Sequence, residues 1–312
     1  MDASDESKNT PLEAASGLSI GSRHLAAPPI APALYLVATP IGNLEDITLR
    51  ALRILAAVDI IACEDSRVTR RLTEHYGIRT RFLPYHEHNA AQMRPKLLAA
   101  LAQGSSVALV SDAGTPLISD PGFKLVRACA EAGHPVSALP GPSAVLAALS
   151  LAGLPTDRFL FDGFLPAKAA ARRARLEELA TIDASLVLFE SGHRVEDSLA
   201  DLAAIMGNRE AAICREMTKL HEEVRRGKLA DLAEEAGALE TRGEFVLVIG
   251  PPTESPTMTV EALDHILRRE LQSGSLKDAV ARAVEHSGWA RRDVYARALE
   301  LKAHGDSATD EA

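Results

Sequence analysis

The stretch LYLVATPIGN, residues 34–43, joins five consecutive apolar residues to a turn that contains Pro and Gly. An unbroken apolar run predicts a strand that is buried on both faces of its sheet. Helical spacing follows at 48–57 through Leu52 and Leu55, and a second apolar run occupies 58–63. A buried strand, a helix and another buried strand in this order are typical of a parallel sheet covered by helices.

The same alternation continues along the chain and predicts an α/β fold with two α/β domains. The apolar rhythm pauses at GLPTD, residues 153–157, which predicts a domain boundary. The strands expected besides 34–38 and 58–63 are 106–110, 136–139, 159–163, 186–189, 211–214 and 245–249. The helices expected besides 48–57 are 67–75, 90–102, 120–132, 143–151, 168–180, 194–206 and 228–237.

A third, helical part follows a Pro-rich linker. Helical periodicity at 260–272, 276–285 and 291–301 predicts a small helix-turn-helix-like module. The segments we predict are a disordered leader (1–30), an N-terminal α/β domain (31–153), a C-terminal α/β domain (154–252), the helical module (258–305) and a disordered tail (306–312).

Composition favours an ordinary soluble globular protein. Of the 312 residues 46% are hydrophobic and 25% charged. We expect a cytoplasmic chain, because we find neither a long apolar span nor a secretory signal. Three widely spaced cysteines predict free thiols and no metal site. The net charge of −9 argues against indiscriminate coating of nucleic acid.

Gly, Pro, Ser and Asp follow four predicted strands, in the segments 39–44, 64–67, 111–122 and 140–144. The carboxyl ends of parallel strands share one edge of a sheet, where doubly wound folds bind their ligands. One such segment would usually be a simple turn, whereas all four together predict a small-molecule crevice. The dinucleotide fingerprint and the P-loop are both absent, so the residues alone do not name the ligand.

The ordered motifs go further, because together they resemble a known family. These motifs are YLVATPIGNL (35–44) with DIT (46–48), EDSR (64–67), HEHN (86–89), 111–122, LPGPS (139–143), GFLP (163–166), FES (189–191) with His193 and Arg194, RE (215–216) and GEF (243–245). The set resembles the small-subunit ribosomal RNA methyltransferase I family, a branch of the tetrapyrrole-methylase-like (class III) methyltransferases. The helical module resembles that family's C-terminal helix-turn-helix.

The resemblance implies that S-adenosyl-L-methionine (SAM) binds between the two α/β domains. It implies as acceptor the ribose 2′-hydroxyl of a cytidine in the decoding region of 16S rRNA, in the small (30S) ribosomal subunit, and a homodimeric enzyme. The cofactor-binding residues carried over are Pro40, Gly42, Asn43, Asp112, Ala113, Gly114, Ser119, Asp120, Pro140, Gly141, Ser143, Phe189 and Glu190.

Removal of the acceptor proton requires a base or a nearby charge, and we expect these groups in two of the motifs. Glu64 and His86 are the preferred candidates, with Asp65 and Arg67 beside them. Two of the four also have an interpretation without a catalytic role. Asp65 is a good N-cap for the following helix, and His86 is compatible with a solvated loop.

Contact with RNA requires cations, and two basic runs stand near the predicted crevice. The candidates are Arg70, Arg71, Lys168, Arg172, Arg173 and Arg194. The alternative for each run is an ordinary solvated helix face, and for Arg194 an ion pair with Glu190 one helical turn away. Two other functions stay open: methylation of a tetrapyrrole or another small acceptor on the same fold, and a non-catalytic RNA- or ribosome-binding protein.

Overall fold

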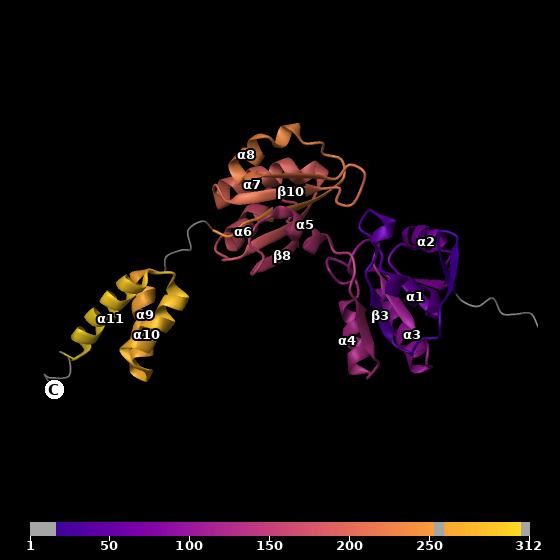
Figure 1. Ribbon diagram of the computed structural model, residues 1–312, viewed down its shortest axis with the longest axis horizontal. Helices are drawn as coiled ribbons and strands as arrows, with labels where there is room; N and C mark the ends of the chain where they lie inside the picture. The colour runs from indigo at the N-terminus through magenta and orange to yellow at the C-terminus, as the bar shows by residue number, and fades with distance from the viewer. Residues whose placement is uncertain (1–16, 253–258, 307–312) are drawn as a thin grey trace, which may run out of the picture.

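The computed structural model describes residues 17–252 and 259–306. Within them lie two α/β domains and a C-terminal group of three helices, coloured from indigo through orange to yellow in Figure 1. This confirms the predicted fold class. No helix in the described ranges is long and apolar enough to cross a membrane.

The first domain is built on a five-stranded sheet in the order β5-β4-β6-β3-β7, and all its strand pairs are parallel. The strands are β3 (Leu34–Val37), β4 (Ile60–Cys63), β5 (Arg81–Pro84), β6 (Val107–Val110) and β7 (Val136–Leu139). The helices are η1 (Leu44–Asp46), α1 (Leu49–Ala57), α2 (Ser66–His75), α3 (Ala90–Ala102), α4 (Phe123–Glu131) and α5 (Ala144–Ala152).

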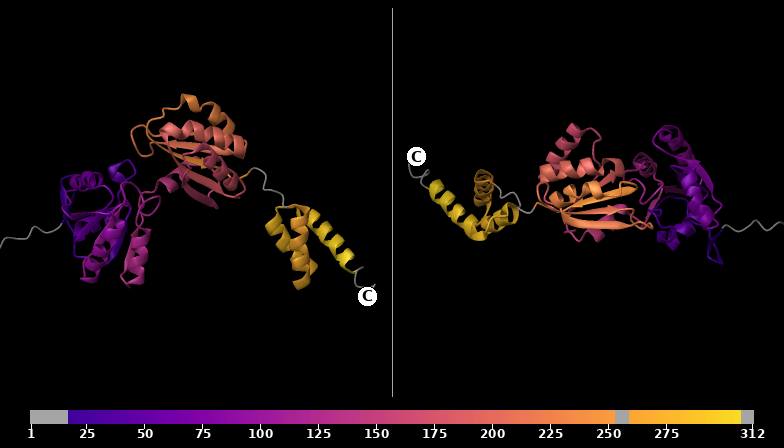
Figure 2. Two further views of the ribbon diagram at one scale, coloured as in Figure 1. Left: turned by 180° about the vertical axis from the view of Figure 1, so that it is seen from behind. Right: turned by 90° about the horizontal axis from the view of Figure 1, so that it is seen from above.

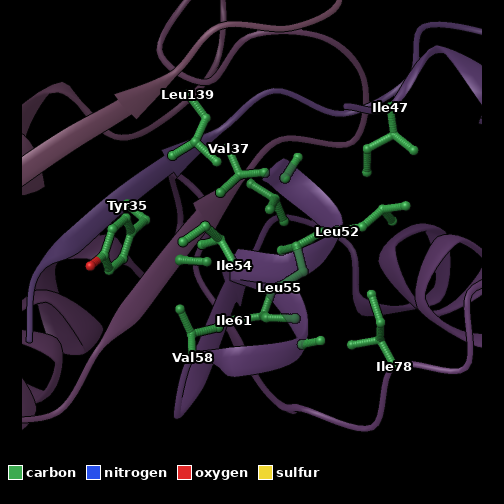
Figure 3. Packing of buried hydrophobic residues seen from close by; sticks show 14 of the residues in the cluster. Tyr35, Val37, Ile47, Leu52, Ile54, Leu55, Val58, Ile61, Ile78 and Leu139 are labelled. Carbon is green, nitrogen blue, oxygen red and sulfur yellow. The ribbon is translucent and has the colours of Figure 1, made fainter. Parts of the chain in front are cut away.

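The core of this domain explains why the apolar runs fold as they do. Leu52 and Leu55 of α1 pack against Val37 of β3 and Ile61 of β4, and all four are buried. Figure 3 shows these side chains converging between the helix and the sheet. Each buried aliphatic side chain of this size contributes about 1.5–3 kcal/mol of stability.

A hairpin precedes the sheet, where we expected a disordered leader over residues 1–30. The strands β1 (Gly17–Ile20) and β2 (Arg23–Ala26) pair antiparallel, so the expectation was wrong for this part. Leu18 is 1% exposed in the core, and the Ser19 N–H donates to the Tyr76 carbonyl at 2.7 Å. Residues 27–30 of the expected leader lie in no helix or strand, and residues 1–16 lie outside the described residues. Of the expected tail 306–312, Asp306 belongs to the last helix of the chain and 307–312 lie outside the described residues.

The second domain is built on a mixed sheet in the order β11-β10-β12-β9-β8, where only β8 and β9 are parallel. Its strands are β8 (Phe159–Phe164), β9 (Ser185–Ser191), β10 (Glu210–Arg215), β11 (Glu223–Lys228) and β12 (Glu244–Ile249). Its helices are α6 (Ala169–Ala180), η2 (Gly192–Arg194), α7 (Val195–Met206), α8 (Leu229–Glu234) and η3 (Ala236–Ala238).

Helix α5 connects the two domains through packing as well as through the chain. Val145 and Leu149 belong to a buried cluster with Val187, Ala212 and Val248 of the second sheet. Figure 2 shows this magenta helix beside the strands of the second domain. The last helix after the first sheet therefore covers a face of the second one.

The three cysteines are free and buried, as the sequence predicted. Cys63 ends β4, Cys129 lies in α4 and Cys214 lies in β10. Burial raises the pKa of each thiol above its ordinary value. A raised pKa disfavours the reactive thiolate, so these side chains act as small apolar residues of the core.

The C-terminal module has a core of its own. Its helices are α9 (Val260–Ser273), α10 (Leu276–Ser287) and α11 (Arg291–Asp306), close to the predicted ranges. Gly288 adopts the left-handed φ of +67° that ends α10, and Arg297 pairs with Asp264 across α11 and α9. The buried hydrophobic cluster of the module consists of Leu263, Leu267, Val280, Ala283, Val294 and Ala298.

Candidate functional site

A cavity of about 310 Å³ lies between the two α/β domains. From the first domain it is lined by the residues that follow β3, β6 and β7, and from the second by the ends of β8 and β9 and the start of β12. The lining residues are Ile41, Ala113, Gly114, Thr115, Ile118, Ser119, Asp120, Ser143, Ala144, Val145, Phe164, Phe189, Glu190, Ser191, Met217, Gly243, Glu244, Phe245 and Val246.

Hydrogen bonds tie the three first-domain loops into one wall. Thr39 and Gly114 exchange backbone N–H···O bonds of 2.9 Å, which joins the loop after β3 to the loop after β6. The Thr115 hydroxyl donates to the Pro142 carbonyl at 3.0 Å and adds the loop after β7. β6, β3 and β7 are neighbours in the sheet, so the predicted convergence of these loops at one edge is confirmed.

Gly114 is the glycine on which this wall depends. Its φ is +77°, and a Cβ there would stand 3.3 Å from Ile41 Cγ2. Any other residue would strain the backbone and crowd the neighbouring loop. The glycine therefore keeps the backbone close to the cavity.

Backbone strain concentrates at the same place. Within the described ranges, the non-glycine residues with positive φ are Leu117, Ser119, Glu216 and Thr218. The first two lie in the loop after β6 and the other two flank the lining residue Met217. Such conformations cost about 1–3 kcal/mol each and persist where surrounding contacts hold them, which is common at ligand sites.

Aromatic rings form part of the second-domain wall. Phe189 contacts Phe161 at a centroid distance of 4.8 Å and Phe164 at 5.5 Å, both edge to face. Phe164 is nonetheless 58% exposed, because one part of its surface borders the cavity. An exposed ring held by a partly buried neighbour suits a planar, apolar ligand group.

Carboxyl groups gather on the first-domain side. Burial and the charges of Glu64 and Asp112 raise the pKa of Asp120 to about 6. Burial also raises the pKa of Glu64 and of Asp112, to which nearby carboxylates add. The mutual repulsion of these groups means that a bound cation would be stabilised here.

Glu190, by contrast, is paired with residues of its own domain. It is 2% exposed, accepts 2.6 Å and 2.9 Å hydrogen bonds from the Ser198 hydroxyl and the Ser191 N–H, and lies 3.4 Å from Arg194. Arg194 in turn donates to the Leu165 carbonyl at 2.6 Å. Arg194 therefore helps to hold the second-domain wall together. Its alternative pairing with Glu190 is confirmed, and its contact with RNA stays a prediction.

The structure divides the predicted cofactor residues into two groups. Those that line the cavity are Ala113, Gly114, Ser119, Asp120, Ser143, Phe189 and Glu190. Those outside its lining are Pro40, Gly42, Asn43, Asp112, Pro140 and Gly141.

Three of the residues outside the cavity lining, Gly42, Asn43 and Gly141, make close packing contacts. A Cβ at Gly141 would meet Ala38 Cβ at 2.9 Å, and one at Gly42 would meet Lys219 Cγ at 2.5 Å. The Asn43 N–H donates to Thr218 Oγ1 at 3.1 Å. These residues pack the loop after β3 against its neighbours in both domains.

Sequence reasoning missed several lining residues. Phe164, Gly243 and Phe245 lay within the quoted motifs, so a signal was present. Their place in the lining could not be predicted without the strand order of the second domain. In that order β12 lies beside β9, and Phe245 pairs with Glu190. Met217 carried no signal, because it lies in the loop between β10 and the edge strand β11, and β11 was not predicted.

The predicted catalytic residues stand beside the cavity rather than in its lining. Glu64 and His86 are close enough that the imidazole opposes the rise in the Glu64 pKa. Asp65 caps α2 by accepting the Arg67 N–H at 2.8 Å and also binds the Arg67 side chain, which is 88% exposed. These contacts lower the pKa of Asp65 to about 2. The capping alternative is thus present in the structure.

The two basic runs differ in exposure. Arg70 and Arg71 on α2 and Lys168 before α6 are exposed. Arg172 is 5% exposed and pairs with Asp201 of α7 at 2.7 Å, and Arg173 binds the other oxygen of the same carboxylate at 2.7 Å. A buried, paired guanidinium cannot reach a phosphate, so the prediction of Arg172 as an RNA contact is wrong. Arg173 is exposed and also joins α6 to α7, and its contact with RNA stays a prediction.

Comparison with known protein families gives two matches. The model for the tetrapyrrole (corrin/porphyrin) methylases matches residues 33–233, and the model for the RsmI C-terminal HTH domain matches 258–302. Solved structures of similar fold include diphthine synthase (TM-score 0.56, 17% identity, 70% of this chain and 89% of that chain). Another is uroporphyrin-III-C-methyltransferase from Thermus thermophilus (TM-score 0.50, 23% identity, 70% and 93%).

Curated relatives extend over nearly the whole chain. The protein named ribosomal RNA small subunit methyltransferase I from Mesorhizobium japonicum is 50% identical over 91% of this chain and 97% of its own length. The proteins of that name from Escherichia coli O157:H7 and Halalkalibacterium halodurans are 46% and 43% identical, over 86% and 84% of this chain and 94% and 93% of their own lengths. The chain belongs to the ribosomal RNA small subunit methyltransferase I family, within the tetrapyrrole methylases.

Proposed function

We propose that this protein transfers a methyl group from S-adenosyl-L-methionine to the ribose 2′-hydroxyl of a cytidine in the decoding region of 16S rRNA. The proposed substrate is the rRNA within the small ribosomal subunit. The observation that carries the proposal is the cavity between the domains, with aromatic rings on one wall and carboxyls on the other. Membership of the family supplies the class of reaction.

The residues of the cavity fit this cofactor. Its volume of about 310 Å³ lies within the range of small-molecule sites. The exposed ring of Phe164 suits an adenine, and the carboxyl of Asp120 complements a positively charged sulfonium and ammonium. The neighbouring charges of Glu64 and Asp112 strengthen the same preference for a cation.

When bound, the cofactor supplies an electrophilic methyl group for an in-line displacement. The chain must then hold donor and acceptor in line, which accounts for about 7–11 kcal/mol of barrier lowering in well-oriented reactions. Gly114 and Ser119 on one side and Phe189 on the other would fix the donor, because each stands on a loop or strand end held by several contacts.

We expect the group that accepts the proton of the ribose 2′-hydroxyl to lie on the acidic side of the site. Asp120 lines the cavity and is assigned to the cationic part of the cofactor, so we assign proton acceptance to the groups next to it. Glu64, which interacts electrostatically with Asp120, and His86, which interacts with Glu64, stay the candidates on the acceptor side. Replacement of Glu64 by Gln without loss of methyl-transfer rate would remove it from this role.

The RNA would meet the exposed basic residues of the body and the C-terminal module. Arg70 and Arg71 lie on α2, whose first turn follows Glu64 and Asp65 directly. The match of residues 258–302 to a helix-turn-helix domain supports a nucleic-acid contact there. We further propose a homodimer acting in the cytoplasm, on the ground of the family resemblance.

A tetrapyrrole or other small acceptor is the alternative on this fold, and solved structures of that kind share it. Neither an exposed basic helix nor a helix-turn-helix module is needed for a small acceptor. The identity of 43–50% to rRNA methyltransferases, together with the separate match of the module to a helix-turn-helix domain, favours RNA.

The test is methyl transfer from labelled cofactor to three acceptors: isolated 30S subunits, protein-free 16S rRNA and uroporphyrinogen. The proposal predicts label in 30S subunits, located at one cytidine whose 3′-phosphodiester becomes resistant to alkali. Label on a nucleobase would refute the 2′-hydroxyl as acceptor. Label on the tetrapyrrole alone would establish the alternative, and binding to 30S without transfer would indicate a non-catalytic protein.

A further inference from the structure

The loop between β10 and β11, residues 216–222, contacts both the cavity wall and the first domain; we name it the bridging loop. Its Met217 lines the cavity. Its backbone is fixed by hydrogen bonds from the Glu216 N–H to the Glu244 carbonyl at 3.0 Å and from the Thr218 N–H to a Glu222 carboxylate oxygen at 2.6 Å. The loop is thus an ordered part of the site.

Lys219 is the side chain that joins the loop to the cavity wall. Its ammonium donates to Glu216 Oε1 at 2.8 Å and to Glu244 Oε2 at 2.9 Å. Glu216 Oε1 also accepts the Glu244 N–H at 3.0 Å. Glu244 and the preceding Gly243 both line the cavity, so one ammonium connects the loop to the start of β12.

The same loop reaches the first domain. Thr218 Oγ1 accepts the Asn43 N–H at 3.1 Å. Gly42 lies so close that a Cβ on it would meet Lys219 Cγ at 2.5 Å and Thr218 Oγ1 at 2.7 Å. The bridging loop therefore connects the two domains immediately beside the cavity.

The backbone of the loop is strained on both sides of Met217. Glu216 has a φ of +49° and Thr218 a φ of +64°, which is costly for a β-branched residue. Strain of this kind persists only when surrounding contacts hold it in place. The contacts of Lys219 and Thr218 are those that hold it here.

We propose that Lys219 is a positioning residue for the methyl donor, because its ammonium keeps Met217 and the start of β12 in place against the cavity. This inference rests on the proposed function, since it assigns the cavity to the cofactor. Without the ammonium, the Glu244 carboxylate would lose its ion pair and the Glu216 carboxylate would keep the Glu244 N–H but no cation. The repulsion between the two carboxylates would then displace the wall.

Lys219 is not a proton acceptor in this scheme. Burial lowers its pKa, but the hydrogen bonds and charges of Glu216 and Glu244 outweigh burial and hold the pKa above its ordinary value. The amine therefore stays protonated at neutral pH. Its contribution is to geometry, and a loss of Lys219 should appear first in cofactor affinity.

The test is calorimetric titration of S-adenosylmethionine into the full chain and into Lys219→Met. The variant should bind the cofactor about tenfold more weakly or worse, while its affinity for 30S subunits stays unchanged. The matched control is Lys228→Met, which removes an ion pair to Glu210 at the opposite end of the same strand pair. This control should bind the cofactor like the wild type.

A second variant separates positioning from simple loss of a charge. Adding Glu244→Gln to Lys219→Met relieves the repulsion between the carboxylates, so it should recover part of the lost affinity. If Lys219→Met does not fold, Thr218→Val carries the test: it keeps the β-branched side chain and removes the acceptor for the Asn43 N–H, and it should also weaken cofactor binding.

Three results are distinguishable. Wild-type affinity in Lys219→Met, or in Thr218→Val where that variant carries the test, would overturn the inference and leave the proposed function standing. Absence of cofactor binding by the wild-type chain would instead overturn the proposed function, and with it this inference. An equal loss in the Lys228→Met control would show a general effect on the sheet and would also overturn the positioning role.

Discussion

At the scale of single residues, the account depends most on the carboxyl of Asp120. It lines the cavity, and its pKa of about 6 results from burial and from the charges of Glu64 and Asp112. The folded chain therefore binds this proton more tightly than the unfolded chain does. Between about pH 4 and pH 6, this group reduces the free energy of unfolding as pH rises, and the full penalty is present above pH 6.

Asp120→Asn should remove that penalty. We expect the variant to be more stable than wild type by about 1 kcal/mol at pH 7.5, a value reduced for partial solvent screening, and equal to it near pH 4. Denaturant unfolding at both pH values measures this difference. A variant that is less stable at pH 7.5 would contradict the electrostatic origin of the pKa.

The same substitution should weaken the binding of a cationic cofactor. A bound sulfonium favours the ionised carboxyl, so wild-type affinity should rise as pH increases through 6, and Asp120→Asn should lose this rise. Calorimetric titration at pH 5.5 and pH 7.5 separates the two behaviours. An identical pH dependence in wild type and variant would remove Asp120 from the cofactor site.

At the scale of helices and strands, sequence predicted the elements that are buried throughout. The apolar runs at β3, β4 and β6 were predicted. β5 and β11 were missed because neither strand contains a buried residue, and most residues of β11 are charged. Hairpin β1–β2 was missed since its order depends on the tertiary burial of Leu18. The sequence also could not show that Arg172 would be buried and paired with Asp201, which lies 29 residues further along the chain.

That buried pair makes a prediction at the same scale. Arg172→Ala leaves the Asp201 carboxylate without its buried partner and should cost about 3–5 kcal/mol of unfolding free energy. Arg173→Ala, which removes the more exposed guanidinium from the same carboxylate, should cost about 1 kcal/mol or less. Denaturant unfolding of the two variants compares them directly, and equal costs would contradict the difference in burial.

The exposed arginines of α2 lead to a further prediction, on RNA binding. Replacing Arg70 and Arg71 together with Ala should weaken binding to 30S subunits and make it less dependent on salt, since each lost phosphate contact lowers the salt slope by about 1. Filter binding over a salt series measures both effects, and cofactor affinity serves as the control. An unchanged slope would place the RNA contact elsewhere.

At the scale of the whole molecule, the cavity and the C-terminal helical module are built from different parts of the chain. The cavity is formed by both α/β domains, whereas the buried cluster of the module contains residues of α9, α10 and α11 alone. Sequence could predict the parts and, through resemblance, their functions. It could not predict which loops meet across the domains, because Gly42 and Thr218 come together only in the fold.

Deletion of residues 253–312 should therefore leave cofactor binding intact. We expect the remaining chain to unfold cooperatively and to bind the cofactor as wild type does, but to bind 30S subunits more weakly and with a smaller salt slope. Calorimetry and filter binding measure the two affinities. Loss of cofactor binding on deletion would show that the module completes the site.

The central claim, a methyl donor bound in the cavity between the domains, is tested most directly by calorimetric titration of S-adenosylmethionine into wild type and Ala113→Trp. Ala113 is an exposed lining residue, so a tryptophan there would fill the cavity at little cost to folding. The matched control is Ala102→Trp at the exposed end of α3, which precedes β6 and so lies at the opposite edge of the sheet. We predict one site per chain in wild type and control, and no binding by Ala113→Trp; equal binding by all three would contradict the account.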